Sequence, residues 1–188
     1  MAVERHKNLL DAEQAVLLVI DVQERFASHI VDFEKMVANI GVLVEAANLL
    51  SLPVVVTEQY RKGLGETVPS IKSKLRPDVG NFEKSCFSAT GSPQVASHLA
   101  KLGRNQVIVC GIETHVCVNQ TVHDLLRLGY QVHLVTDALS SRSAENKLVG
   151  LAKMYAAGAL PSSVECCLFE MLVESGTERF KAVQKLVK

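Results

Sequence analysis

Short runs of apolar, mostly β-branched residues alternate along this chain with longer segments of helical periodicity. This alternation is typical of a parallel β-sheet whose strands are joined by helices. Five runs are predicted to be strands: Val16–Ile20, Val54–Thr57, Gln106–Cys110, Gln131–Val135 and Val164–Phe169. A weaker sixth strand is predicted near Phe82–Cys86. The first two are separated by roughly the 30 residues that a right-handed βαβ crossover needs. We therefore predict an α/β fold: a single domain over residues 1–188, built as a doubly wound, Rossmann-like six-stranded parallel sheet with helices on both faces.

Helices are predicted where apolar residues recur on one face at helical spacing. Ser92 and Pro93 form a helix start, and Gly103 marks the end of that helix. The last predicted helix carries Phe180 and Val183 and runs to the C-terminus. The other three helical segments are marked by these apolar residues: Met36 to Leu50, Val118 to Leu126, and Leu148 to Tyr155.

The charges of the chain balance, with 20 Lys+Arg against 20 Asp+Glu. Proteins that bind a phosphate backbone or a membrane surface need a basic excess, so we predict neither a nucleic-acid nor a membrane partner. Hydrophobic residues make up 48% of the chain, which is typical of a globular protein and excludes a disordered one.

The chain has five cysteines, an odd number, and no CxxC pair. This pattern favours reduced thiols over a disulfide framework. The first residues, MAVERHKNLLDAEQ, mix acids with bases and lack the apolar core of a signal peptide. We therefore predict a cytoplasmic location. Cys110, Cys166 and Cys167 lie within predicted strands and are expected to be buried.

Polar residues follow several predicted strands, at the edge where doubly wound sheets bind their ligands. Asp21 follows the first strand, Lys84 lies in the weak strand, and Cys117 follows the Gln106–Cys110 strand at a helix start. A helix start lowers the pKa of a thiol from its free value of about 8.5, and the thiolate is the reactive form. If the first strand neighbours the Cys117 strand, a carboxylate, an ammonium and a thiol converge there.

Each of these residues also has a plainer interpretation. Asp21 could cap a loop, Lys84 could be a solvated surface group, and Cys117 could be a small buried residue. Cys86 is either a second reactive thiol or a packing residue of the strand. Arg142 is a solvated arginine beside a helix N-cap, or else part of a subunit contact or of the edge of a pocket.

Three motifs together resemble a known family over nearly the whole chain. They are Asp-x-Gln at Asp21, Glu-Lys-x-x-Phe-Ser at Glu83, and Gly-x-x-Thr-x-x-Cys-Val at Gly111. Because these motifs occur in this order, the chain resembles the isochorismatase-like cysteine hydrolases, a superfamily that includes nicotinamidases. The stretches 57–65 and 135–143 most resemble its isochorismatase-domain-containing subgroup.

The resemblance implies a catalytic triad of Asp21, Lys84 and Cys117. Asp21 would take the thiol proton as general base and return it to the leaving group, while Lys84 would hold the thiolate and orient the carboxylate. A cis peptide bond between Ile112 and Glu113 is also implied. It would aim the amide of Glu113, together with that of Cys117, at the developing oxyanion.

Two departures from related proteins bear on cofactors. Nicotinamidases carry an Asp and His metal cluster after the second strand, where this chain has Thr57, Glu58, Gln59 and Tyr60. We therefore predict no metal. No Gly-rich phosphate turn follows the first strand, so no flavin or nucleotide cofactor is predicted either.

Five residues are expected to bind the substrate: Gln23, Phe26, Tyr60, Phe87 and His115. Phe26 and Tyr60 would form apolar walls, and His115 would lie at the pocket rim or on the surface.

The sequence thus predicts a metal-independent cysteine hydrolase. It would cleave a C–N bond, of amide or carbamoyl type, in a small and largely neutral molecule through a thioester. The alternative is a non-catalytic protein of the same fold that serves as an interaction surface or a thiol redox sensor. Because the family commonly forms dimers and tetramers, a homo-oligomer is expected.

Overall fold

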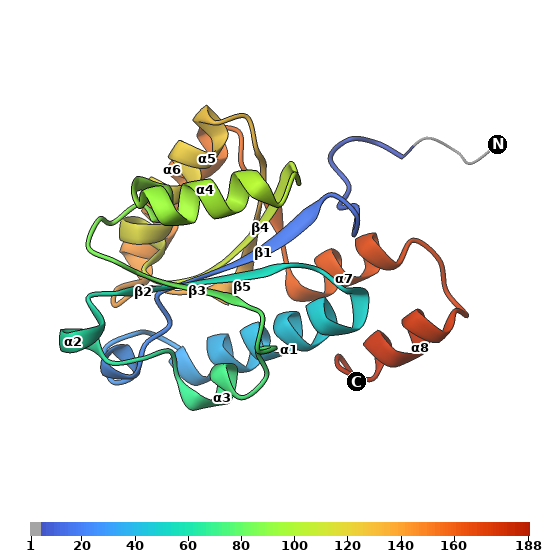
Figure 1. The fold of residues 1–188 in the computed structure, drawn as a ribbon, viewed down its shortest axis with the longest axis horizontal. Coiled ribbons are helices and arrows are strands. Elements are labelled where there is room, and N and C mark those ends of the chain that lie inside the picture. Colours follow the sequence, from blue (N-terminus) through green and yellow to red (C-terminus); the bar gives the residue numbers. More distant parts are fainter. Residues whose placement is uncertain (1–4) are drawn as a thin grey trace.

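Six parallel strands form one sheet in the order β3-β2-β1-β4-β5-β6 (Figure 1). The structure is a computed structural model and describes residues 5–188. The strands are β1 Ala15–Ile20, β2 Val54–Gln59, β3 Gly80–Lys84, β4 Gln106–Gly111, β5 Gln131–Leu139 and β6 Leu160–Ser162. The chain winds outward from β1 to β3, returns to β4 beside β1, and winds outward again. The predicted doubly wound sheet is therefore confirmed, and its strand order reverses between β1 and β4.

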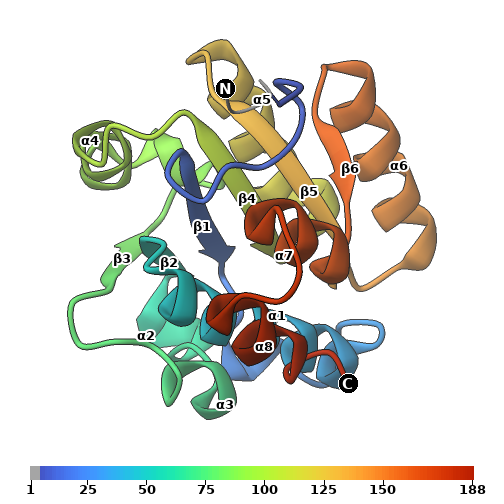
Figure 2. The same ribbon diagram turned by 90° about the vertical axis from the view of Figure 1, so that its right-hand side faces the viewer.

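Helices cover both faces of this sheet (Figures 1 and 2). One layer contains α1, α7 and α8, and the opposite layer contains α4, α5 and α6. The helices are α1 Phe33–Leu50, α2 Arg61–Leu64, α3 Pro69–Lys72, α4 Pro93–Lys101, α5 Asn119–Arg127, α6 Ala144–Ala156, α7 Val164–Leu172 and α8 Glu178–Gln184. The described residues also form two 3₁₀ turns and one π-helical turn: η1 Glu24–Phe26, η2 Ala89–Gly91 and η3 Thr114–Val118.

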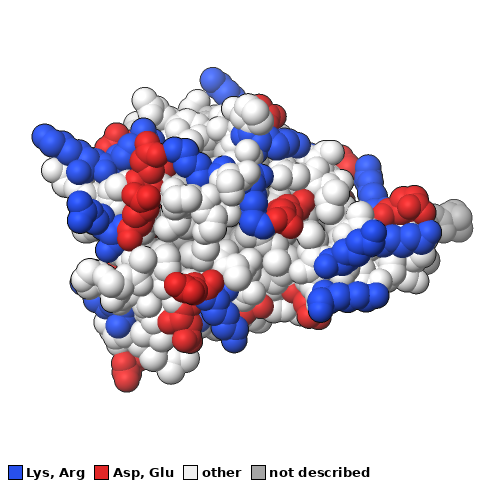
Figure 3. Space-filling model, turned by 90° about the horizontal axis from the view of Figure 1, so that it is seen from below, with Lys and Arg blue, Asp and Glu red and all other residues white. Residues whose placement is uncertain are grey.

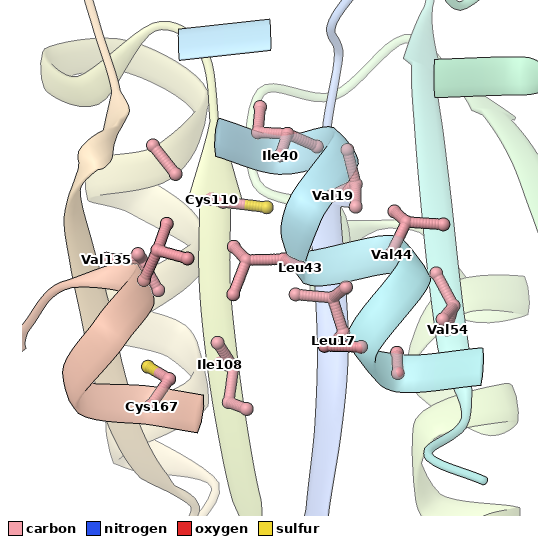
Figure 4. Packing of buried hydrophobic residues seen from close by; sticks show 14 of the residues in the cluster. Leu17, Val19, Ile40, Leu43, Val44, Val54, Ile108, Cys110, Val135 and Cys167 are labelled. Atoms are coloured by element: carbon pink, nitrogen blue, oxygen red, sulfur yellow. The ribbon is translucent and has the colours of Figure 1, made fainter. Parts of the chain in front are cut away.

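The central strands are apolar because they are covered on both faces. Every residue of β1 is buried, and its odd and even positions belong to two separate hydrophobic clusters. Figure 4 shows the cluster under α1, where Ile40 and Leu43 lie over Leu17 and Val19 of β1. Burying one such side chain contributes roughly 1.5–3 kcal/mol. The sheet therefore provides a rigid frame for the loops at its carboxyl edge.

Residues Val164–Phe169, predicted to be a strand, instead begin α7. The hydroxyl of Ser163 accepts a hydrogen bond from the amide of Cys166 (3.2 Å) and caps the helix start. The buried positions are Val164, Cys167, Leu168, Met171 and Leu172, which repeat at helical rather than strand spacing. The sixth strand is the short β6 just before this cap.

Three smaller expectations are also corrected. Cys166, expected to be buried, is exposed because it lies on the outer face of α7. Leu148 is exposed, and α6 instead buries Gly150, Leu151 and Met154. The last helix, α8, ends at Gln184 rather than at the C-terminus.

Gly111, the last residue of β4, lies where β4 meets the end of β1. Its φ is 112°, and a Cβ atom there would lie 2.1 Å from the carbonyl oxygen of Ile20. Only glycine fits this close approach. It brings the segment that carries Cys117 directly beside the segment that carries Asp21.

Candidate active site

Asp21 and Lys84 form a buried ion pair at the carboxyl edge of the sheet. The Lys84 Nζ lies 2.7 Å from Oδ2 of Asp21, and both side chains are almost completely excluded from solvent. Asp21 follows β1, and Lys84 is the last residue of β3, so β2 lies between them. The hydroxyl of Thr57, in β2, donates to the other carboxylate oxygen, Oδ1, at 2.7 Å. These contacts fix the carboxylate at both of its oxygens.

Four acceptors surround the Lys84 ammonium. Besides Asp21, they are Oε1 of Gln59 (2.7 Å) and the carbonyl oxygens of Cys86 and Phe87 (both 3.1 Å). A buried ammonium is stable only when its charge is paired and its N–H groups are satisfied. Lys84 is therefore not the solvated surface group of the alternative interpretation.

Cys117 lies beside this ion pair, in η3 at the start of the continuous helix that becomes α5. The Asp21 carboxylate and the Lys84 ammonium lie near enough to its thiol to shift the pKa of this group in opposite directions. The residue is 7% exposed, so it lies just below the surface. The structure thus brings together the three side chains that the strand-end argument placed in one site.

The acidity of the Cys117 thiol differs from the prediction. Burial, followed by the negative charge of Asp21, raises the pKa of this thiol to about 12, although the Lys84 ammonium opposes the change. The expected lowering by the helix start is therefore wrong for the free protein. The resting site holds a thiol next to a carboxylate that can accept its proton.

Two contacts fasten the Lys84 loop to the helix of Cys117. Thr121 donates to the carbonyl of Cys117 (2.6 Å), and its oxygen accepts the amide of Ala89 (2.8 Å). The hydroxyl of Ser88 donates to Asp124 at 2.7 Å. The loop whose carbonyls hold the Lys84 ammonium is therefore fixed relative to Cys117.

The peptide bond between Ile112 and Glu113 is cis. The carbonyl of Glu113 accepts the amides of Val116 and Val118, which starts η3. Within residues 5–188, no hydrogen-bond acceptor meets the amide of Glu113. This donor is therefore available beside the turn that carries Cys117.

The buried Glu113 carboxylate is held by Arg142 from the loop after β5. The Arg142 backbone amide (3.0 Å), Nε (3.0 and 3.1 Å) and Nη2 (2.5 Å) all donate to it. Burial would raise the pKa of this carboxyl, but the hydrogen bonds and charge of Arg142 outweigh burial and hold the pKa below its ordinary value. Arg142 is 63% exposed and precedes the Ser143 cap of α6, as expected for a solvated arginine beside a helix N-cap, but its side chain also holds Glu113.

The five residues expected to bind substrate lie in different environments. The Gln23 side chain donates to the carbonyls of Gln59 and Gly65 and accepts the amide of Gln59, so it holds the loop after β2. Phe26 is partly buried and lines a cleft. Tyr60 and Phe87 are more than half exposed. His115 is half-buried, and its Nδ1 lies 3.1 Å from the Ser141 hydroxyl.

Thr57 and Gln59, which contact the ion pair directly, were not predicted as site residues. The available signal was their position: both lie near the end of β2, between the two charged residues. Glu58, in the same stretch, is buried and accepts hydrogen bonds from Thr67, Arg61 and Asn81. Within residues 5–188, no three His, Cys, Asp or Glu side chains are grouped to hold a metal ion.

None of the helices in residues 5–188 has the length and hydropathy needed to cross a lipid bilayer. The fold and the buried Asp–Lys–Cys cluster define a doubly wound α/β protein with a thiol at the point where the strand order reverses. Residues 15–166 match the model of the isochorismatase domain. The chain belongs to the isochorismatase family.

Two curated relatives are similar over most of their length. The secreted isochorismatase effector Isc1 of Phytophthora sojae is 43% identical over 93% of this chain and 84% of its own. Isochorismatase domain-containing protein 2 of Bos taurus is 40% identical over 93% of this chain and 83% of its own. This similarity confirms the predicted subgroup.

A solved structure, that of MAR1 ribonuclease from Caenorhabditis elegans, superposes with a TM-score of 0.91. It is 41% identical and covers 95% of this chain and 92% of its own. The name of that protein refers to RNA cleavage, whereas the balanced charge of this chain predicts no nucleic-acid partner.

Proposed function

We propose that this protein is a cysteine hydrolase that cleaves a C–N bond of a small molecule through a thioester. Family membership supports hydrolysis in general. The observation that carries the finer proposal is the buried Asp21–Lys84 pair beside the Cys117 thiol. A thiol whose own pKa is high needs a neighbouring base to act as a nucleophile.

In the first half of the reaction, Asp21 takes the proton of Cys117 as the sulfur attacks the carbonyl carbon. A C–S bond forms, and the carbonyl oxygen becomes an oxyanion. The amides of Glu113 and Cys117 are the proposed donors to this oxyanion, and losing one such donor typically costs about 2.7–4 kcal/mol of transition-state stabilisation. Asp21 then returns the proton to the nitrogen, the C–N bond breaks, and the amine or ammonia leaves.

In the second half, Asp21 takes a proton from water as the water oxygen attacks the thioester carbon. The C–S bond breaks, the acid product leaves, and the sulfur regains the proton from Asp21. Lys84 keeps the carboxylate oriented throughout, because its ammonium is itself held by Gln59 and two carbonyls. No metal is required in this sequence of steps.

The test is release of ammonia or amine from a library of small amides and carbamoyl compounds. We expect a burst that is lost in Cys117→Ala and in Asp21→Asn. Cys166→Ala is the matched control, because Cys166 is an exposed cysteine on α7, and it should retain the burst. A burst that survives in Cys117→Ala contradicts the proposal.

Ribonuclease activity is the second candidate, supported by 41% identity to the C. elegans MAR1 ribonuclease. The net charge of 0 opposes it, and in the described part of the face shown in Figure 3 basic side chains lie among acidic ones. RNA cleavage would not need a thiol. Cleavage of a labelled RNA by Cys117→Ala at the wild-type rate would favour this second activity.

The redox-sensing alternative is weakened by the raised pKa of the thiol. Sensor cysteines are accessible and ionised at neutral pH, whereas Cys117 is buried with a pKa raised to about 12. If no substrate turns over and peroxide readily converts Cys117 to a sulfenic acid, the sensor is favoured over the hydrolase.

The expected homo-oligomer and cytoplasmic location stay predictions.

A further inference from the structure

A cleft of about 390 Å³ opens among loops that follow β1, β2 and β5. It is lined by Arg25, Phe26, His29, Ile30, Leu64 and Arg142. Its walls come from segments that also build the site. Phe26 follows Asp21 in the same loop, Leu64 precedes the Gly65 carbonyl held by Gln23, and Arg142 holds Glu113. A cavity of this size accommodates a small organic molecule.

The lining combines apolar side chains with basic ones. Phe26, Ile30 and Leu64 supply the apolar surface, whereas Arg25, His29 and Arg142 carry the polar groups. Among residues 5–188, no acidic side chain lines the cleft. Such a lining fits a ligand that has an apolar body and an anionic group at one end.

Arg142 is held in place to meet that anionic group. Its Nε and Nη2 bind the Glu113 carboxylate, and within residues 5–188 no acceptor meets its Nη1. The side chain is nevertheless 63% exposed, so the remaining N–H edge is open to solvent. A guanidinium that is already oriented loses less conformational freedom when it binds an anion.

The charges around the cleft set the charge of the ligand. Glu113 neutralises one of the two guanidiniums, and Arg25 forms no ion pair within the described residues. About one net positive charge therefore remains among the side chains that line the cleft at neutral pH. We infer that this cleft binds a small monoanion with an apolar body, of the class of arylalkyl carboxylates.

This inference deepens the proposed function and rests on it, because the cleft would hold the part of the substrate that does not react. It replaces the largely neutral substrate expected from the sequence. The substrate would then be an amide or carbamoyl compound that also carries one carboxylate. Binding itself does not require the nucleophile, so the two proposals can be tested separately.

The experiment measures binding of phenylacetate and phenylacetamide to Cys117→Ala by NMR titration. The two probes have the same apolar body and differ in charge. We expect phenylacetate to bind about ten-fold more tightly, since its carboxylate gains a charge-assisted hydrogen bond. Adding Arg25→Gln should weaken phenylacetate binding about five-fold and leave phenylacetamide unchanged. Arg179→Gln, which removes the same charge from α8 outside the cleft, should change neither.

Equal affinity for the two probes, or phenylacetate binding that Arg25→Gln does not weaken, overturns the inference. The chemical shifts of His29 and Leu64 should move during the titration, and shifts confined to another surface also overturn it. If phenylacetate binds as expected but Cys117 releases no amine from any substrate, the proposed function fails alone. If the protein turns over neutral amides and binds phenylacetate and phenylacetamide equally well, the proposed function stands and the inference about the cleft is wrong.

Discussion

The Asp21–Lys84 pair couples the chemistry of the site to the stability of the protein. Both charges are buried, and each satisfies the other. A buried ion pair adds little to stability when both partners are present, because desolvation offsets the attraction. Removing one partner leaves an uncompensated charge, which typically costs about 3–5 kcal/mol.

We therefore predict that Lys84→Met lowers the free energy of unfolding by about 3–5 kcal/mol at pH 7. The double variant Asp21→Asn/Lys84→Met should recover part of this loss, since no charge is then left unpaired. Urea denaturation measures both. Lys181→Met is the control, because it breaks the exposed pair with Glu178 and should cost at most about 1 kcal/mol. A Lys84→Met loss as small as that of the control contradicts the buried pairing.

The positions of Asp21, Lys84 and Cys117 could be predicted because strand ends are visible in the sequence and meet at one edge of a parallel sheet. The acidity of the Cys117 thiol could not be predicted from the sequence. The helix start alone suggests a lower pKa, whereas the burial that raises it comes from packing of distant segments. Cys117 belongs to a hydrophobic cluster that also contains Ala89 of η2 and Leu151 of α6, and no local pattern places these segments near η3.

Among the elements, α7 shows that an apolar run can be predicted as a strand and yet form a helix, because a capping residue lies before it. The run 164–169 has no residue that breaks a strand, and periodicity over six residues does not separate a buried strand from a helix. The strands β1, β2, β4 and β5 could be predicted because their runs are buried on both faces. For α7 the useful signals lay outside the run: Ser163 before it, and Met171 and Leu172 after it.

We predict that Ser163→Ala destabilises the protein by about 1 kcal/mol, because the amide of Cys166 loses its acceptor. Thermal or urea denaturation gives the value. Ser97→Ala provides the opposite expectation. Ser97 lies exposed within α4, where alanine is the better helix former, so this change should leave stability equal or raise it by up to about 0.5 kcal/mol. Equal losses in the two variants would show that the Ser163 hydroxyl does not cap α7.

At the scale of the whole molecule, balanced charge makes single buried groups important for the pH dependence of stability. With 20 basic and 20 acidic residues, the chain has little net repulsion near neutral pH. Buried groups whose pKa differs between the folded and unfolded states then contribute strongly to the pH profile. Among the histidines, His133 in β5 is such a group, because it lies within the sheet between β4 and β6 and is 2% exposed.

Burial lowers the pKa of His133 to about 4, against an ordinary value of about 6.5. Below pH 6.5 the unfolded chain therefore binds a proton that the folded protein does not, and stability falls as the pH drops toward 4. Between pH 7 and pH 5 this difference amounts to about 2 kcal/mol. We predict that the wild type loses about 2 kcal/mol more than His133→Gln over this interval, measured by urea denaturation at both pH values. His6→Gln, at an exposed position, should lose as much as the wild type. Parallel pH profiles for the wild type and His133→Gln would contradict a neutral, buried imidazole in the sheet.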